Sequence, residues 1–190
     1  MPFLARHQLE SMGFRYLGRE VKLSDKASIY NASAIAIGDF SRIDDYCVLS
    51  AGSGGISIGR NVHIAVYCSL IGAERIELQD FSGLSSRVSI YSSNDDYSGN
   101  SMTNPTVPSD YTHVTSLPVI LQRHAIVGSG TIILPGVNIN KGAAIAALSL
   151  IKRDCEAFGI YSGIPAKRIG TRSDGLMDQE ARYLQSEKKR

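Results

Sequence analysis

The sequence predicts an all-β protein in which short parallel strands stack into a solenoid of triangular coils. Three observations support this fold class. The chain of 190 residues contains 20 Ile, 24 Ser and 18 Gly but only 9 Tyr, 5 Phe and no Trp. An aliphatic residue recurs every six positions, and the breaks in that repeat are regularly placed. Small and β-branched side chains suit stacked strands better than a helical bundle.

The six-residue repeat is uninterrupted in the second half of the chain, where Leu121, Val127, Ile133, Ile139, Ile145 and Ile151 begin successive hexads. A small or short residue follows each start by four positions. With phase shifts allowed, 19 of 21 hexad starts between residues 17 and 169 are Ile, Leu or Val, against about five expected by chance. The aliphatic residue points into a prism, the small one fits a corner, and coils stack about 4.8 Å apart.

The phase shifts indicate where the solenoid is interrupted. They add two residues after Ala34, three after Gly54, two after Arg75 and twenty-five after Asp95. Each follows a third hexad, so all of them leave one corner of the prism. We therefore expect residues 17–170 to form one domain of about seven triangular coils, with a loop insertion at residues 96–120.

The two ends of the chain lie outside the repeat. Residues 1–16 are expected to form an N-terminal cap, with a helix within 2–12. Residues 171–190 are expected to form a C-terminal helix and tail. The helix is predicted over 173–187, with Ser173 as its cap and with apolar residues on one face at Leu176, Met177, Tyr183 and Leu184. Both segments would cover the exposed strand edges at the ends of a solenoid.

Composition and charge argue against several classes of function. The net charge is +2, and the only basic run is the terminal segment 188–190, so the sequence makes no case for nucleic-acid binding. No apolar run reaches the roughly 18 residues of a membrane span, and no secretory signal is present, so we expect a cytoplasmic protein. The three cysteines form no CxxC pair, which argues against a zinc knuckle or a disulfide framework.

The hexads resemble those of the hexapeptide-repeat acyltransferases. The match is clearest at residues 37–39 (Ile-Gly-Asp), 58–62 (Ile-Gly-Arg-Asn-Val) and 127–130 (Val-Gly-Ser-Gly). Residues 162–169 (Ser-Gly-Ile-Pro-Ala-Lys-Arg-Ile) are similar to the closing segment of acetyl-CoA-dependent members. The resemblance implies a left-handed parallel β-helix, acetyl-CoA as acyl donor, and a homotrimer with active sites in the clefts between neighbouring subunits.

A second group of sequence segments is most similar to the corresponding segments of the small bacterial sugar acyltransferases. It comprises Tyr91, residues 94–99 (Asn-Asp-Asp-Tyr-Ser-Gly), Pro105-Thr106 and 119–121 (Val-Ile-Leu). This resemblance implies transfer of an acetyl or other small acyl group to the amino group of a nucleotide-linked amino sugar. The product would serve surface polysaccharide biosynthesis, such as that of the O-antigen of lipopolysaccharide. The alternative is O-acetylation of a sugar hydroxyl.

The predicted catalytic residue lies at the start of the insertion. Galactoside-type relatives carry a histidine there, whereas this chain reads Ser92-Ser93-Asn94-Asp95. The resemblance to amino-sugar N-acyltransferases places Asp95 at the position of a catalytic carboxylate. A carboxylate attracts a sugar ammonium and removes the one proton that keeps it from being a nucleophile. On the residues alone, Asp95 and Asp96 also fit the start of an ordinary solvated loop.

Other polar residues are candidates for the same site. His124, four residues into the first face after the insertion, is the alternative base. Asn94, Asp96, Tyr97 and His63 are expected to bind the sugar substrate. A histidine on a strand surface equally fits an interface or exposed position, so the sequence leaves both readings of His63 and His124 open.

Small residues mark a predicted path for CoA. Gly128 and Ser129 precede Ala146 and Ala147 by 18 residues, one full coil, so the two pairs should stack. Small side chains there would let pantetheine approach the backbone amides. In the closing segment, Ala166, Lys167 and Arg168 are expected to meet CoA, with the two cations on its phosphates. The alternative is that the small residues serve only the packing of the coils.

The sequence disfavours two other classes of protein that share this fold. A zinc hydratase needs three converging histidines, and His63, His113 and His124 do not show its spacing, so we expect no metal site. A non-catalytic β-helix scaffold is disfavoured by the closing segment and by the long insertion.

Overall fold

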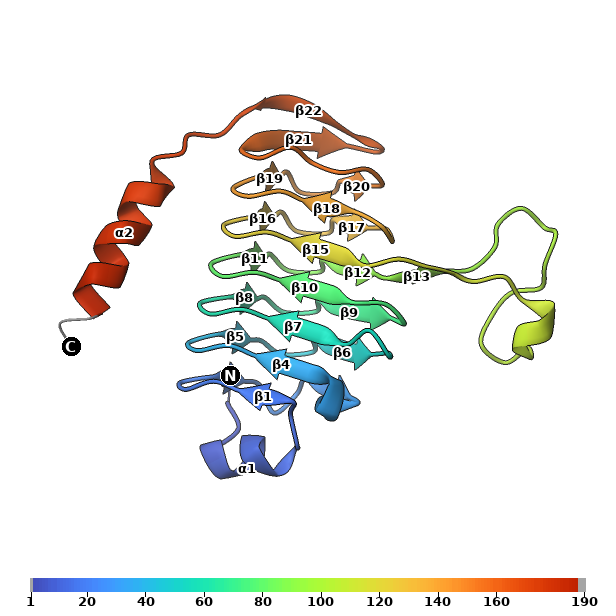
Figure 1. Ribbon diagram of the computed structural model, residues 1–190, viewed down its shortest axis with the longest axis horizontal. Coiled ribbons are helices and arrows are strands. Elements are labelled where there is room, and N and C mark those ends of the chain that lie inside the picture. Colours follow the sequence, from blue (N-terminus) through green and yellow to red (C-terminus); the bar gives the residue numbers. More distant parts are fainter. Residues whose placement is uncertain (1, 188–190) are drawn as a thin grey trace.

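The computed structural model describes residues 2–187 and confirms the predicted solenoid of about seven turns. Figure 1 shows the coils stacked from β1 near the N-terminal end to β22 at the C-terminal end. A long loop projects from one side of the stack, and the C-terminal helix descends on the other. Within the described residues, no helix is both long enough and apolar enough to span a bilayer.

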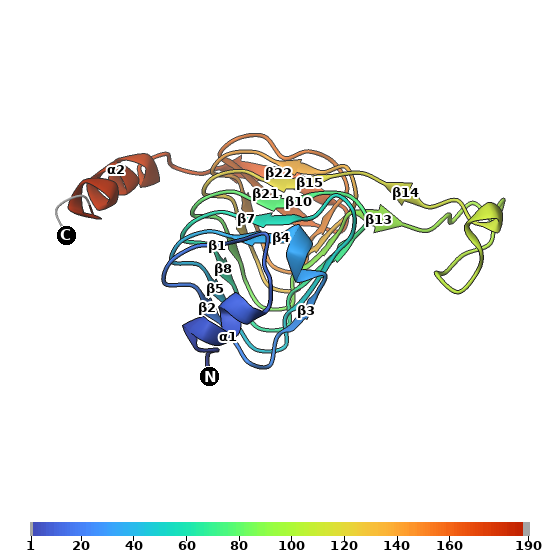
Figure 2. The ribbon, with the colours of Figure 1, turned by 60° about the horizontal axis from the view of Figure 1, so that its bottom comes forward.

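Three sheets form the faces of the prism, and Figure 2 looks more nearly along its axis. The first face consists of β1 (Tyr16–Leu17), β4 (Ile35–Ile37), β7 (Ile56–Ile58), β10 (Ile76–Leu78), β15 (Val119–Leu121) and β18 (Asn138–Ile139). The second consists of β2 (Lys22–Leu23), β5 (Arg42–Ile43), β8 (His63–Ile64), β11 (Gly83–Leu84), β16 (Ile126–Val127), β19 (Ala144–Ile145), β21 (Gly159–Gly163) and β22 (Ala166–Thr171). The third consists of β3 (Ser28–Tyr30), β6 (Val48–Ala51), β9 (Ser69–Gly72), β12 (Ser89–Tyr91), β17 (Ile132–Ile133) and β20 (Leu150–Ile151).

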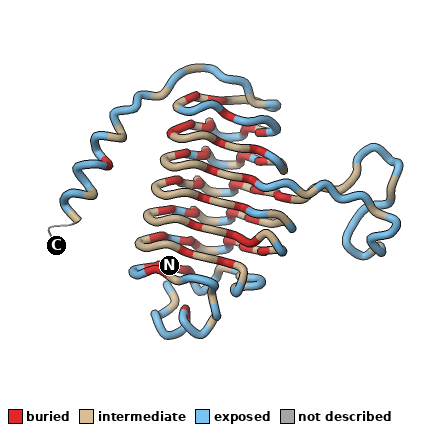
Figure 3. The backbone as a smooth tube through the Cα atoms, in the orientation of Figure 1, coloured by how far each residue is buried: buried red, intermediate tan, exposed pale blue. Residues whose placement is uncertain are grey.

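The aliphatic hexad starts form the core of the prism. Ile43, Ile64 and Val127, which begin hexads on the second face in three different coils, are fully buried. Figure 3 shows buried positions repeating along each coil, while most of the projecting loop is exposed. Each coil buries its apolar residues against those of its neighbours, so the coils hold one continuous core.

The phase shifts lengthen the first face as well as its preceding corner. Strands β4, β7, β10 and β15 each have two inward residues, and the first of them belongs to the inserted positions: Ile35, Ile56, Ile76 and Val119. The long insertion therefore differs from the predicted 96–120. The chain leaves the coil at β13 (Ser93–Asn94), which pairs antiparallel with β14 (Thr115–Ser116), and it rejoins the first face at Val119.

The repeat also ends earlier than predicted. Ala144 pairs with Ile160, so the last coil has 16 residues instead of 18. Continuing the six-residue spacing beyond Ile151 places hexad starts at residues 157, 163 and 169, and this prediction is wrong. After Gly163 the chain turns back, and β22 runs antiparallel to β21, leaving Ile169 exposed. An antiparallel strand satisfies the edge of β21 without requiring another coil.

The N-terminal helix lies at one end of the solenoid, whereas the C-terminal helix packs beside the coils, with Tyr183 against Phe81, and does not cover the C-terminal strand edge as predicted (Figure 1). Helix α1 (Arg6–Ser11) is shorter than the predicted 2–12 and buries Leu9. Helix α2 (Leu176–Glu187) begins three residues later than predicted, and its buried residue is Glu180. Two 3-10 turns, η1 (Ala32–Ala34) and η2 (Ser109–Tyr111), complete the elements. The basic segment 188–190 lies outside the described residues.

Replacing Gly38 by alanine is expected to destabilise the solenoid. A Cβ atom at Gly38 would lie 2.5 Å from the carbonyl carbon of Gly59 in the next coil, and backbone in a stacked sheet has little room to move. We expect a loss of about 1–3 kcal/mol in the free energy of unfolding, measured by denaturant titration. Gly83→Ala is the matched control, because a Cβ there meets only the His63 carbonyl oxygen, at 3.9 Å. Equal losses in the two variants would contradict the steric explanation.

Candidate functional site

The second face of the prism carries a hollow of about 300 Å³. It forms because Gly83 stands in register between His63 and Ile126 and presents no side chain there. The hollow is lined by His63, Ala65, Gly83, Leu84, Ser85, Ser86, Ile126 and Ser129. It brings His63, predicted to bind the sugar, together with Ser129, predicted to contact CoA.

A buried carboxylate orients His63 at this hollow. The His63 ring is 53% exposed, and its Nε2 lies 2.9 Å from the Oδ2 of Asp44, whose side chain is only 7% exposed. Arg42 donates from Nε to the other carboxylate oxygen at 2.6 Å. Burial alone raises the pKa of Asp44, but the hydrogen bonds from Arg42 and His63 outweigh it and hold the pKa below its usual value. Asp44 is therefore an anion that accepts a hydrogen bond from the imidazole.

The predicted column of small residues is present. Ile126 pairs with Ala144 and Val127 with Ile145, so Gly128 and Ser129 stack on Ala146 and Ala147. The Ser129 carbonyl accepts a hydrogen bond from the Leu148 amide at 2.8 Å. The column continues through Ser162 and Gly163, because the last coil is shortened. The 18-residue spacing would instead place Ile164 and Pro165 there.

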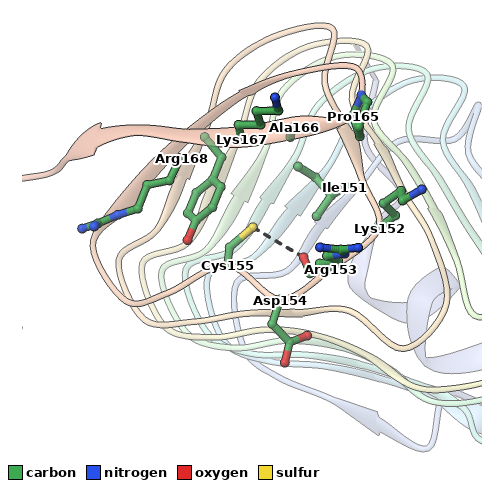
Figure 4. A pocket seen from close by; sticks show the side chains of 10 residues that line it. Ile151, Lys152, Arg153, Asp154, Cys155, Pro165, Ala166, Lys167 and Arg168 are labelled. Carbon is green, nitrogen blue, oxygen red and sulfur yellow. Dashed lines mark hydrogen bonds between the residues drawn. The ribbon is translucent and has the colours of Figure 1, made fainter.

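A second cavity, of about 340 Å³, lies at the C-terminal end of the solenoid (Figure 4). Ala166, Lys167 and Arg168, predicted to meet CoA, line it on β22, and three further charged residues belong to its lining. Its lining consists of Ile151, Lys152, Arg153, Asp154, Cys155, Tyr161, Pro165, Ala166, Lys167 and Arg168. Burial raises the pKa of the Cys155 thiol to about 12, so this cysteine stays protonated. The cavity therefore combines an apolar floor with four cations and a single aspartate.

Asp95 and Asn94 lie at the root of the projecting loop. They line a third cavity, of about 640 Å³, between the loop and Ile71 of β9. The Asn94 amide donates to the Asp95 carbonyl at 3.2 Å. No hydrogen bond from residues 2–187 reaches the Asp95 carboxylate, which leaves both oxygens available to a ligand.

Asp96 and Tyr97, which follow Asp95 in the sequence, have surroundings that differ from those of Asp95. The Asp96 carboxylate accepts hydrogen bonds from the Ser98 amide at 2.8 Å, the Ser98 hydroxyl at 2.9 Å and the Ser101 amide at 3.1 Å. These bonds, the Ser98 amide first, hold the pKa of Asp96 below its usual value. Tyr97 is 87% exposed. In this chain Asp96 thus organises the loop, and neither residue lines the cavity of Asp95.

His124 is not brought to Asp95 within the chain. The loop returns at the start of β15, whereas His124 follows the end of that strand and contacts α2. Its Nε2 lies 2.8 Å from Glu180, its ring stacks on Phe81 with centroids 5.1 Å apart, and its side chain is 13% exposed. Arg123 also pairs with Glu180. Its position therefore indicates that His124 anchors α2, and offers no support for the predicted role as a base.

Acidification is expected to weaken this anchor. Burial, followed by the charges of Arg123, Arg172 and Lys141, holds the pKa of His124 below its ordinary value of 6.5, even though Glu180 is a hydrogen-bond partner. The unfolded chain therefore binds the proton more readily, so stability is complete above about pH 6.5 and falls as the pH drops toward the folded pKa. Thermal unfolding from pH 8 to pH 5 should show a smaller slope for His124→Gln than for the unsubstituted protein. Equal slopes would contradict this role of His124.

The three histidines weighed for a zinc site lie in different parts of the molecule. His63 is on the second face, His124 is under α2, and His113 is exposed in the projecting loop. No group of three His, Cys, Asp or Glu side chains within residues 2–187 is arranged to hold a metal ion.

The sequence did not indicate Gly83 and Ser85 as lining residues of the hollow, or Asp44 as the partner of His63. Arg42 and Gly83 are in register with His63 in the neighbouring coils, and Asp44 lies two positions after Arg42, but this is visible only once the coil lengths of 20 to 21 residues are known. Ser85 follows the inward-pointing Leu84 at a corner of the coil. Packing alone explains a small residue at that position, so the sequence did not single it out. The acidic partner of His124 was missed because Glu180 lies on a helix far away in the sequence.

Comparison with known proteins gives matches over nearly the whole chain. A dTDP-4-amino-4,6-dideoxy-D-glucose acyltransferase from Escherichia coli is 52% identical over 186 residues, 98% of this chain and 97% of that protein. AntD, an N-acyltransferase from Bacillus cereus solved in complex with dTDP and 3-hydroxybutyryl-CoA, is 40% identical with a TM-score of 0.93 and covers 98% of each chain. A variant of AntD in complex with dTDP-4-amino-4,6-dideoxyglucose and coenzyme A has a TM-score of 0.94 at 40% identity over 97% of each chain. No protein-family model matches the sequence.

Proposed function

The chain belongs to the family of left-handed β-helix N-acyltransferases that use acyl-CoA and nucleotide-linked amino sugars, and from this premise we propose its specific reaction. It transfers an acetyl or other small acyl group from CoA to the 4-amino group of a dTDP-4-amino-4,6-dideoxyhexose. The observation that carries the proposal is the 52% identity over 97% of the Escherichia coli enzyme, because that match includes the coils, the projecting loop and the closing hairpin. The acyl-CoA donor places the reaction in the cytoplasm, and the product serves a surface polysaccharide.

The donor is proposed to lie along the small-residue column. Pantetheine would run from the hollow past Ser129, Ala147 and Gly163, three coils that span roughly 10–15 Å at the ordinary spacing of stacked strands. Gly128 and Ala146 keep side chains out of this path. The CoA phosphates would meet Lys167 and Arg168 on β22, beside Ala166, where charge-assisted donors bind phosphate strongly. Backbone amides along the column would then polarise the thioester carbonyl.

The acceptor is proposed to meet Asp95. Its carboxylate has both oxygens available, and an ammonium group bound there loses the proton that blocks nucleophilic attack. Asn94 lines the same cavity and would orient the sugar through its amide, with His63 bordering the sugar in the hollow. Asp96 would contribute to sugar binding by holding the conformation of the loop. Tyr97 would contribute through its exposed side chain.

A homotrimer completes the proposed site. The loop extends away from its own solenoid (Figures 1 and 2), and Asp95 therefore lies apart from the hollow that holds His63 and Ser129. Exposed apolar side chains occur both on the loop, at Val114, and on the coils, at Ile132 and Leu148. Exposed apolar surface of this kind marks interfaces. In the trimer, the loop of one copy would cover the hollow of the next.

Release of the CoA thiol tests the proposed reaction. Purified protein is mixed with acetyl-CoA and either a dTDP-4-amino-4,6-dideoxyhexose or the matched sugar that carries a 4-hydroxyl group. We expect thiol release only with the amine, together with a product that is heavier by one acetyl group in mass spectrometry. Release with the hydroxyl sugar would indicate O-acylation, and release with neither would contradict the proposed acceptor. Light scattering during gel filtration tests the trimer.

A further inference from the structure

Among residues 2–187, two histidines pair with a carboxylate, and one of the two borders an open cavity. His124 is 13% exposed, stacks on Phe81 and is covered by α2. His63 is 53% exposed and borders the hollow on the second face, although its partner Asp44 is almost fully buried. A buried aspartate behind an accessible histidine is an arrangement that orients an imidazole for proton transfer.

We propose that His63, oriented by Asp44, carries a proton from the attacking nitrogen of the acceptor to the sulfur of CoA. The inference rests on the proposed function and deepens it, because it adds a catalytic residue, His63, and a positioning residue, Asp44, to a site in which only Asp95 has so far been given a proton to move. It changes the role of His63 from bordering the sugar to taking part in the reaction.

The pairing with Asp44 fixes which ring nitrogen is available. Asp44 is an anion, and its Oδ1 already accepts a hydrogen bond from Arg42 at 2.6 Å. Oδ2 must therefore accept from His63, which requires the proton of the neutral imidazole to be on Nε2. Nδ1 is then an unprotonated acceptor, and no residue among 2–187 forms a hydrogen bond with it.

The shape of the hollow gives reacting atoms access to this imidazole. The neighbour of His63 in the next coil is Gly83, and a Cβ there would find only one atom within 4 Å. A side chain at that position would fill the space beside the ring. Ser129, the first residue of the proposed pantetheine column, lines the same hollow. The thioester end of CoA and an acceptor amine would therefore meet next to His63.

The charged groups that face His63 come from the preceding coil. They are Asp44 and, beyond it, Arg42, which is also in register with His63 on the adjacent strand. The following coil contributes Gly83 and the serine hydroxyls of Ser85 and Ser86. This side of the ring is thus uncharged and hydroxyl-rich, which suits the transient charges of acyl transfer.

The proposed transfer moves one proton from the acceptor to Asp95 and a second one through His63 to the CoA sulfur. Asp95 first takes one proton from the sugar ammonium. The free amine attacks the thioester carbonyl carbon, which forms the C–N bond and leaves an oxyanion and a positively charged nitrogen. Nδ1 of His63 accepts one proton from that nitrogen. When the C–S bond breaks, the imidazolium returns the same proton to the departing thiolate, so the products are an amide and free CoA thiol.

Steady-state kinetics with the dTDP-amino sugar and acetyl-CoA test the role of His63. We expect His63→Gly to lower kcat by about 10²- to 10³-fold while KM for acetyl-CoA changes by less than about threefold. Added imidazole should restore part of the lost rate in this variant, because it fills the vacated space with the missing base. Lys22→Ala, an exposed position two coils away on the same face, is the control and should behave as the unsubstituted enzyme.

Asp44→Asn tests the positioning role. Arg42 would hold the amide oxygen, so the amide nitrogen would face His63, donate to Nε2 and force the imidazole proton onto Nδ1. We expect a loss of kcat of at least tenfold, and ¹⁵N NMR of histidine-labelled protein should show the change of tautomer without any substrate present. Thermal unfolding of both variants checks that they are folded.

The outcomes separate this inference from the proposed function. Amine-dependent thiol release by the unsubstituted enzyme, combined with His63→Gly activity within about twofold of it or with no rescue by imidazole, would overturn the role of His63. An Nδ1–H tautomer in the unsubstituted protein would overturn it as well. Absence of amine-dependent release by the unsubstituted enzyme would instead overturn the proposed function, and the inference with it.

Discussion

Asp95→Asn is expected to lower kcat for amide formation by about 10²- to 10⁴-fold, with little change in binding of acetyl-CoA. The asparagine amide keeps the size of the side chain but can neither attract an ammonium group nor accept its proton. Asp95 is proposed to contact the acceptor amine, and it does not belong to the small-residue column that is proposed to hold CoA. Kinetics at several pH values check the mechanism, because raising the pH supplies free amine and should recover part of the rate in the variant.

Asp110→Asn is the matched control for this substitution. Asp110 is an exposed aspartate of the same loop, within η2, and it does not line the cavity of Asp95. Its replacement changes the net charge of the loop by the same amount, so it isolates the position of the carboxylate from a general electrostatic effect. Near-normal turnover by Asp95→Asn would assign the removal of the ammonium proton to another group, and similar losses in both variants would indicate a general effect of loop charge.

Much of the fold was predictable because the hexad is a local rule repeated many times. Each coil needs an aliphatic residue on every face, so Ile133, Ile139 and Ile145 identify three successive faces without knowledge of distant contacts. The rule fails where something other than the repeat determines the chain path. Ala144 pairs with Ile160 in a shortened coil, and the strand that follows turns back as an antiparallel partner. A spacing rule derived from regular coils contains no information about such an ending.

The candidate site was less predictable because its residues come from coils of different lengths. The sequence indicated His63 and Ser129 separately, and only the strand register shows that they border one hollow. Asp44 and His63 pair at a separation of 19 residues, because this coil has 21 residues and Asp44 lies two positions after Arg42, the residue in register with His63. His124 was misplaced for a different reason. Its neighbours Phe81 and Glu180 come from another coil and from α2, and no repeat specifies where α2 lies.

Shortening the projecting loop is expected to abolish activity without unfolding the solenoid. Ser93 pairs with Ser116 and Asn94 with Thr115, so the antiparallel stalk holds the two ends of the loop side by side. Residues 97–112 can therefore be replaced by a Gly-Ser-Gly linker that keeps Asp95, Asp96 and the stalk. The cost of closing a shorter loop differs little from that of the original, since loop-closure entropy changes slowly with length.

This deletion is expected to leave the solenoid folded and to abolish transfer. Every coil of the prism keeps its buried aliphatic residues, because the loop leaves the core at Ser93 and rejoins it at Val119. The deletion removes most of the cavity that surrounds Asp95, including Asn104, Pro105 and Val107, so an acceptor bound there would lose its contacts. Circular dichroism and thermal unfolding should show a melting temperature within a few degrees of the unsubstituted protein, while thiol release falls below detection. Because Asp95 itself is retained, an active deletion variant would show that the carboxylate works without its enclosing loop, and a variant that fails to fold would show that the coils depend on it.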